Sequence, residues 1–125
     1  MHDASVVDAI TFSARVEARA AFLRFAAIAD LVALRVDDQG ERVWWACDGW
    51  DAACAEVGAA LGIGAREASG QMATAVALRF RLPRVAAVFA AGEVSARIVA
   101  LICWRTRLVE DPDILALLDA ALSGA

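Results

Sequence analysis

The sequence predicts an all-α protein, a bundle of about six helices that begins with a long N-terminal helix. Three observations support this fold class. Hydrophobic residues make up 61% of the 125 residues, and much of the excess over an ordinary domain is alanine, the strongest helix former. Apolar residues recur at helical spacing along the first third of the chain. Glycine and proline then punctuate the remainder at short intervals.

The first helix is expected over about residues 4–36, because this stretch contains neither glycine nor proline. Two apolar rows run along it at helical spacing. One row comprises Val16, Ala20, Leu23, Ala27, Leu31 and Leu34. The row on the neighbouring face comprises Phe22, Phe25, Ala29 and Val32. Such a wide apolar stripe predicts contacts on two sides of the helix.

Turn and capping residues divide the rest of the chain. Residues 43–50 hold three of the four tryptophans, and they read either as a short strand or as an irregular packed loop. The five further helices are predicted over about 51–61, 65–82, 84–91 (with Pro83 at the start), 95–109 (opened by Ser95 or Glu93) and 112–122. For the last of them, Asp111 is the expected N-cap residue.

The segment at about 51–82 resembles a helix-turn-helix unit. Gly58 lies four residues before the turn glycine Gly62, and a small residue there permits a close crossing of two helices. Arginine suits guanine and glutamine suits adenine in the major groove. The side chains that we expect to contact DNA are Arg66, Ser69, Gln71, Thr74, Arg79, Arg81 and Arg84. Many proteins use this unit only for packing, and that alternative stays open.

The charge distribution gives the middle of the chain a basic character. The formal net charge of −4 argues against an indiscriminate nucleic-acid binder. Between residues 57 and 109, however, seven arginines stand against two glutamates, which gives this segment +5 between acidic flanks. A basic centre favours a binding face.

Catalytic groups are scarce. The only histidine is His2, and the sequence has no lysine or tyrosine, so we expect no catalytic residue, no metal site and no cofactor. The cysteines at 47, 54 and 103 lack the paired spacing of a zinc site or a disulfide framework, which predicts buried, reduced thiols. No apolar run reaches the length of a membrane span, and no secretory signal is visible. We therefore expect a cytoplasmic protein without membrane contact.

A mean hydropathy of +0.58 is high for a chain outside the membrane and predicts self-association. The interface is expected on the long first helix. Its predicted residues are Phe22, Leu23, Phe25 and Val32.

Several phrases resemble the actinobacterial 13E12 repeat family, the domain of unknown function 222. They include Trp45-Ala46-Cys47-Asp48-Gly49-Trp50, Arg81-Leu82-Pro83-Arg84-Val85 and Trp104-Arg105-Thr106-Arg107-Leu108-Val109-Glu110-Asp111-Pro112. The likeness spans nearly the whole chain. In that family this helical region lies N-terminal to an HNH endonuclease module, which implies a role in mobile-element or DNA-processing proteins.

The resemblance covers only the front part of the family's domain, and with His2 as its one histidine the chain cannot supply an HNH site. We therefore expect residues 1–125 to form a single helical domain without nuclease activity of its own. Its expected role is to bind or target double-stranded DNA, as a homo-oligomer or with a C-terminal partner domain. The alternative is a protein-interaction or dimerisation module with no direct DNA contact.

Overall fold

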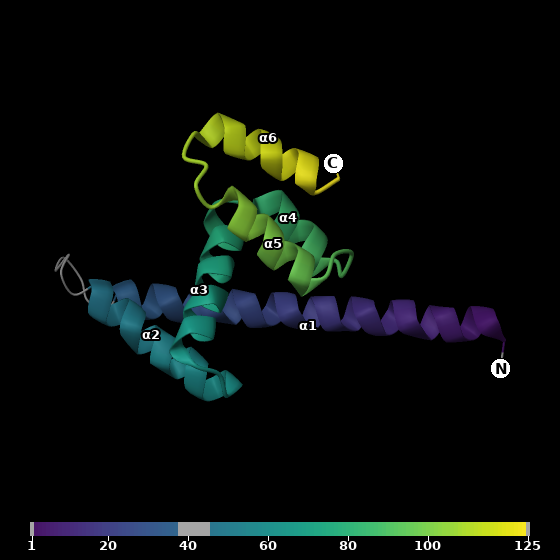
Figure 1. The fold of residues 1–125 in the computed structure, drawn as a ribbon, viewed down its shortest axis with the longest axis horizontal. Helices are drawn as coiled ribbons and strands as arrows, with labels where there is room; N and C mark the ends of the chain where they lie inside the picture. Colours follow the sequence, from purple (N-terminus) through teal and green to yellow (C-terminus); the bar gives the residue numbers. More distant parts are fainter. Residues whose placement is uncertain (1, 38–45, 125) are drawn as a thin grey trace. The chain divides into compact units, whose positions relative to one another are not determined.

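The computed structural model describes residues 2–37 and 46–124, and within these ranges it contains helices and no strand (Figure 1). The six helices are α1 (Asp3–Asp37), α2 (Ala46–Leu61), α3 (Ala65–Phe80), α4 (Pro83–Ala90), α5 (Ala96–Thr106) and α6 (Pro112–Leu122). The predicted all-α class and the long first helix are confirmed. The ends of α3 and α5 fall two and three residues earlier than predicted.

The second helix begins earlier than the sequence indicated. Residues 46–50, for which we weighed a strand or a packed loop, form the first turns of α2, so both alternatives are wrong for these residues. The reason is a continuous helical period, because the half-buried Trp50 is followed by the buried Ala53 and Val57 at spacings of three and four. Residues 43–45 lie outside the described part of the chain.

The chain gathers into two compact units, each with its own buried residues. One unit comprises residues 1–24 and 77–125, and the other comprises residues 25–76. The core of the 25–76 unit consists of Phe25, Ile28, Ala29, Val32, Ala53, Val57, Ala68, Met72 and Ala75. The core of the other unit includes Ala18, Ala21, Leu78, Leu82, Val85, Phe89, Val99 and Cys103.

The two apolar rows of α1 differ in burial. Phe25, Ala29 and Val32 are buried, whereas Leu23 and Leu34 of the other row are 66% and 57% exposed. Both rows are apolar, so the sequence of α1 alone does not distinguish them. The buried row is the one that large side chains elsewhere in the chain contact, as Phe89 contacts Phe22.

The connection between α2 and α3 is a three-residue turn. Gly62 adopts a φ of +67°, a left-handed conformation that glycine accommodates without a steric cost. The backbone N–H of Ile63 donates to the carbonyl of Gly58 at 3.0 Å, and this closes the end of α2 as a Schellman motif does. A Cβ atom at Gly58 would lie only 3.0 Å from the Ile63 carbonyl oxygen. A small residue at 58 is therefore a condition of this turn.

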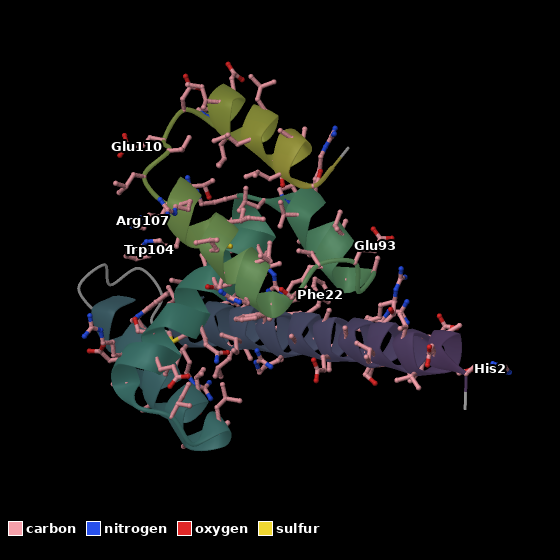
Figure 2. All side chains as sticks on the ribbon, turned by 45° about the vertical axis from the view of Figure 1, so that its right-hand side comes forward. His2, Phe22, Glu93, Trp104, Arg107 and Glu110 are labelled. Carbon is pink, nitrogen blue, oxygen red and sulfur yellow. The ribbon has the colours of Figure 1, made fainter. Side chains whose placement is uncertain are left out.

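In the unit of residues 1–24 and 77–125, α5 and α6 both contact α4. Phe89 of α4 is completely buried. The ring of Phe22, from α1, meets it edge to face with 5.9 Å between the ring centres. Phe22 projects from α1 in Figure 2. Aromatic pairs in this geometry contribute about 1 kcal/mol beyond the area that they bury.

The N-terminus of α4 is capped by a side chain from α6. Its N-cap position is Leu82, which has no side-chain acceptor. The carboxylate of Asp119 accepts from the backbone N–H groups of Arg84 at 3.0 Å and of Val85 at 2.9 Å. Asp119 is only 3% exposed. It thus satisfies two donors that the first turn of a helix leaves unpaired, and its negative charge suits that end of the helix dipole.

The C-terminus of α5 is bound by a positively charged side chain. The Arg81 guanidinium donates to the carbonyls of Thr106, Arg107 and Val109, with donor–acceptor distances of 3.3 Å and 3.2 Å for the first two. A cation stabilises carbonyls at the negative end of a helix. The remaining caps are local: the Ser95 hydroxyl accepts from Ile98 N–H at 3.3 Å, and Asp111 caps α6 as predicted.

The buried cap gives the first testable prediction. Asp119→Asn places an amide N–H₂ where one backbone N–H needs an acceptor, so we expect the free energy of unfolding to fall by about 2 kcal/mol. Glu93→Gln removes the same charge at an exposed position and should change it by less than about 0.5 kcal/mol. Urea unfolding followed by circular dichroism measures both. Equal effects of the two substitutions would contradict the capping role.

Two glycines in the α2–α3 segment should respond oppositely to the same substitution. Gly70 lies exposed within α3 with nothing within 4 Å of a built Cβ, so Gly70→Ala should raise the free energy of unfolding by about 1 kcal/mol. Gly58→Ala meets the Ile63 carbonyl and should lower it by about 1 kcal/mol despite the gain in helix propensity. Thermal unfolding of both variants tests this, and a stabilising Gly58→Ala would show that the close approach is absent.

Candidate functional site

Four of the predicted DNA-contacting residues lie on α3 within the 25–76 unit. Arg66 is exposed, and Ser69 and Gln71 are half-buried. Thr74 is only 9% exposed, and its hydroxyl donates to the Gly70 carbonyl at 3.2 Å. The expectation that Thr74 faces a groove is therefore wrong, because a hydroxyl bonded to the preceding helical turn is committed to its own helix.

The surface around Arg66 is close to neutral. The exposed positions in this part of α3 are Ala65, Arg66, Glu67, Gly70 and Ala73, so one arginine is balanced by its neighbouring glutamate. The 25–76 unit as a whole contains three arginines and eight acidic residues, a formal charge of −5. Phosphate attraction, the main term in DNA affinity, is therefore weak here.

The other three predicted residues belong to the second unit. Arg79 and Arg84 are exposed there. Arg81 is half-buried and holds the carbonyls at the end of α5, so its assignment to DNA contact is corrected to a structural role. This unit carries nine arginines and eight acidic residues, a formal charge of +1. The arginines counted in the sequence are thus divided between the two units, and one of them, Arg81, stabilises the fold.

The four residues predicted to form an oligomer interface differ in their exposure. Phe25 and Val32 are 5% and 8% exposed and belong to a core. Phe22 is half-buried against Phe89. These three assignments are corrected, because an apolar row at helical spacing fits a core as well as an interface. Leu23, on the opposite face, is 66% exposed and stays available for contact.

The start of α1 is the most exposed apolar element in the described part of the chain. Every residue from His2 to Glu17 is exposed. Its large apolar side chains are Val6, Val7, Ile10, Phe12 and Val16, with exposures from 43% to 68%. A helix with apolar residues on several sides is usually buried against something. This segment, with Leu23, is the candidate interaction surface, and we call it the α1 surface.

One ion pair ties α1 to α2 inside the 25–76 unit. The Arg35 guanidinium binds the Glu56 carboxylate through two hydrogen bonds of 2.6 Å and 2.8 Å. The hydrogen bond from Arg35 lowers the pKa of Glu56 below its usual range, and the positive charge adds to this effect. Glu56 is therefore held ionised as a structural partner. Its contribution is present above the ordinary glutamate pKa and is lost as the pH falls through the lowered value.

The side chains most suited to nucleophilic chemistry are the histidine and the cysteines, and those that the structure describes lie apart from one another or are shielded from solvent. His2 lies at the N-terminal end of α1 (Figure 2). Burial raises the pKa of the Cys103 thiol to about 11, so the reactive thiolate is scarce at neutral pH. The half-buried Cys54 thiol donates to the Ala65 carbonyl at 3.3 Å. These two cysteines are packing residues. The side chain of Cys47 lies outside the described part.

Over residues 2–37 and 46–124, His, Cys, Asp and Glu side chains nowhere converge in threes as a metal site requires. Of the helices that the structure describes, none combines the length and apolar composition needed to cross a bilayer.

Sequence reasoning missed the two charged residues that hold helix ends. Asp119 stands alone within the apolar run 114–122, and an isolated acid in such a run is a recognisable sign of a buried cap. Arg81 precedes Leu82-Pro83 and gives no comparable signal. Its role depends on the fold bringing the C-terminus of α5 next to the Arg81 side chain.

Comparisons with known proteins place the chain in a family. It is 53% identical over 121 residues, 97% of its length, to "Uncharacterized protein in est 3'region" of Mycobacterium tuberculosis and to "Uncharacterized protein Rv3776" of Mycobacterium tuberculosis (strain ATCC 25618 / H37Rv). It covers 34% of the first of these relatives and 23% of the second. No solved structure matches it. Residues 12–124 match the "Domain of unknown function (DUF222)", so the chain belongs to this family, the 13E12 repeat family that its sequence resembles.

Proposed function

We propose that this chain is a helical interaction module of a DNA-processing protein, which associates with another polypeptide through the α1 surface and has no nuclease activity of its own. The observation that carries the proposal is the uninterrupted exposure of residues 2–17, with five large apolar side chains among them. Exposed apolar area on this scale usually marks a contact site. We place the module in the cytoplasm, where its thiols stay reduced.

Helix energetics support a partner for this segment. An isolated helix of about 12–15 residues is marginal in water even with favourable residues. All of the first fifteen residues of α1 are exposed, and the turn at Gly92 lies close to the backbone of one of them, Arg15. Packing Ile10 and Phe12, which are 65% and 68% exposed, against another apolar surface would supply about 25 cal/mol for each Å² covered.

One side of the α1 surface is suited to packing against a second helix. Phe12, Val16 and Leu23 are separated by four and seven residues, so they share one side of the helix. Asp8 and Arg19 border this side with opposite charges, which favours one orientation of the partner. The partner is either a second copy or another segment of a longer polypeptide, since the chain spans 34% or less of the curated relatives it matches.

The α1 surface makes a prediction about mass in solution. Leu23→Asp places a charge on the exposed row without touching a core, so we expect association to weaken by about tenfold or more while helicity is unchanged. Light scattering at several concentrations measures the mass, and circular dichroism measures the helicity. Glu67→Arg, a charge change at an exposed position of α3 outside the α1 surface, is the matched control. Association that is insensitive to Leu23→Asp would exclude the α1 surface as the site of self-association.

Direct DNA contact is the second candidate function, and the α2–α3 turn is the observation that favours it. Two helices of 16 residues each are joined by Gly62, Ile63 and Gly64, as in helix-turn-helix readers. Arg66 is exposed in the first turn of α3, where such readers place a base contact. The charge of −5 on this unit makes any DNA contact by it dependent on a few specific hydrogen bonds.

Sequencing the fraction of a random duplex DNA pool that binds at near-physiological salt tests this candidate. If α3 reads DNA, a motif is enriched, and Arg66→Ala loses it with a cost of about 1–3 kcal/mol. Arg15→Ala removes the same charge from exposed α1 and should leave the motif in place. An unenriched pool, or equal losses from the two substitutions, would leave the interaction module as the function.

A further inference from the structure

A second exposed apolar row runs along α5. Ile98, Leu101, Trp104 and Leu108 are 44%, 48%, 60% and 79% exposed. The last three are separated by three and four residues, so they lie on one side of the helix and its first residues beyond. The opposite side of α5 holds the buried Val99 and Cys103. The outward row therefore has no role in the core that α5 helps to form.

Positive charge surrounds this row. Arg97, Arg105 and Arg107 are exposed, and residues 94–109 contain no acidic residue. The Arg107 guanidinium carbon lies 3.5 Å from the centre of the Trp104 ring, and Nη1 of the same arginine donates to the Trp104 carbonyl at 2.6 Å. Figure 2 shows the two side chains together at the C-terminal end of α5. The cation–π contact orders an exposed tryptophan before any partner arrives. We call this basic, apolar row the α5 face.

The next helix offers the opposite charge on a similar surface. Ile114 and Leu117 of α6 are 50% and 72% exposed, and Ala121 continues the same side. Three exposed acids, Glu110, Asp111 and Asp113, stand at the start of this row. No basic residue occurs after Arg107. We call this acidic, apolar row the α6 face.

We propose that the α5 face of one molecule packs against the α6 face of a second copy, and reciprocally, in a twofold dimer. Leu101, Trp104 and Leu108 then cover Ile114 and Leu117 of the other copy, with arginines along one edge meeting acids along the other. Twofold symmetry forms each contact twice and closes the assembly at two copies. The proposal goes beyond the proposed function, because it uses neither the α1 surface nor α3.

Charge complementarity favours a second copy of the chain as the molecule that covers the α5 face. The α5 face carries three arginines and no acid, and the α6 face carries three acids and no base. The α1 surface carries three acids, Asp3, Asp8 and Glu17, against Arg15 alone. These charges are spread along its length, so it matches the α5 face less closely than the α6 face does. Both faces belong to the same compact unit, so the dimer requires nothing from the 25–76 unit.

A single-stranded nucleic acid is the competing occupant, since tryptophan and arginine together stack on bases. The acidic residues that follow the α5 face disfavour binding of a nucleic acid there. Glu110 follows Arg107 after two residues, and Asp111 and Asp113 follow in turn, so a phosphate chain along the α5 face would approach three carboxylates. An apolar row with acids at one end only brings fewer negative charges to these carboxylates than a phosphate chain does, and it covers the leucines as well.

Charge reversal tests the pairing. Arg105→Glu and Asp113→Arg each replace an attraction with a repulsion, so each single variant should dimerise at least about tenfold more weakly in sedimentation at about 0.15 M salt. An equimolar mixture of the two variants restores opposite charges at both contacts and should recover the dimer mass. The double variant should recover it as well. Glu93→Arg, an exposed reversal outside both faces, should dimerise like the original protein.

The outcomes separate this proposal from the proposed function. Leu23→Asp acts on the α1 surface and leaves the α5–α6 dimer intact, whereas Arg105→Glu acts only on the dimer. A protein that is monomeric at tens of micromolar overturns the dimer, and so does a dimer that neither reversal weakens or that the mixture fails to restore. Binding of a fluorescent single-stranded oligonucleotide that Trp104→Ala abolishes, with no change of mass on its own, would assign the α5 face to nucleic acid instead.

Discussion

The unpaired backbone groups at the ends of α4 and α5 need partners from elsewhere in the chain, and two charged side chains supply them. Asp119 accepts from the first N–H groups of α4, and Arg81 donates to the last carbonyls of α5. A buried polar group without a partner costs about 1–3 kcal/mol. The arrangement of residues 77–125 therefore depends on these two side chains as much as on the contact of Phe22 with Phe89. Each charge also matches the sign of the helix end that it meets.

The sequence was sufficient where local chemistry decides the structure. Pro83 begins α4, Gly62 ends α2 and Asp111 caps α6, and each of these positions was predicted from the residue type alone. It was insufficient where the answer depends on distant residues. Both rows of α1 are apolar, and only the position of other helices decides which row is buried. The same limit applies to Arg81, which counts as a basic residue in sequence and is a helix-end ligand in the structure.

The binding residues were predicted less well than the fold, for a related reason. Thr74 stands at a suitable distance from Arg66 in the sequence, yet its hydroxyl is bonded within α3. Of the four predicted interface residues, Leu23 alone is well exposed. A hydrophobic or charged residue in a pattern shows what kind of contact it can make. Whether that contact is internal or external depends on burial, and the Trp104–Arg107 pair became visible as a surface feature only with the structure.

The cap on α4 affects the order in which the chain can acquire its structure during synthesis. Asp119 follows Val85 by 34 residues, so the first turn of α4 has no acceptor until synthesis has reached α6. The partners of the 25–76 unit, including Arg35 and Glu56, are complete much earlier. A ribosome carrying a nascent chain of this protein would therefore display a finished acidic unit while α4 still lacks its cap.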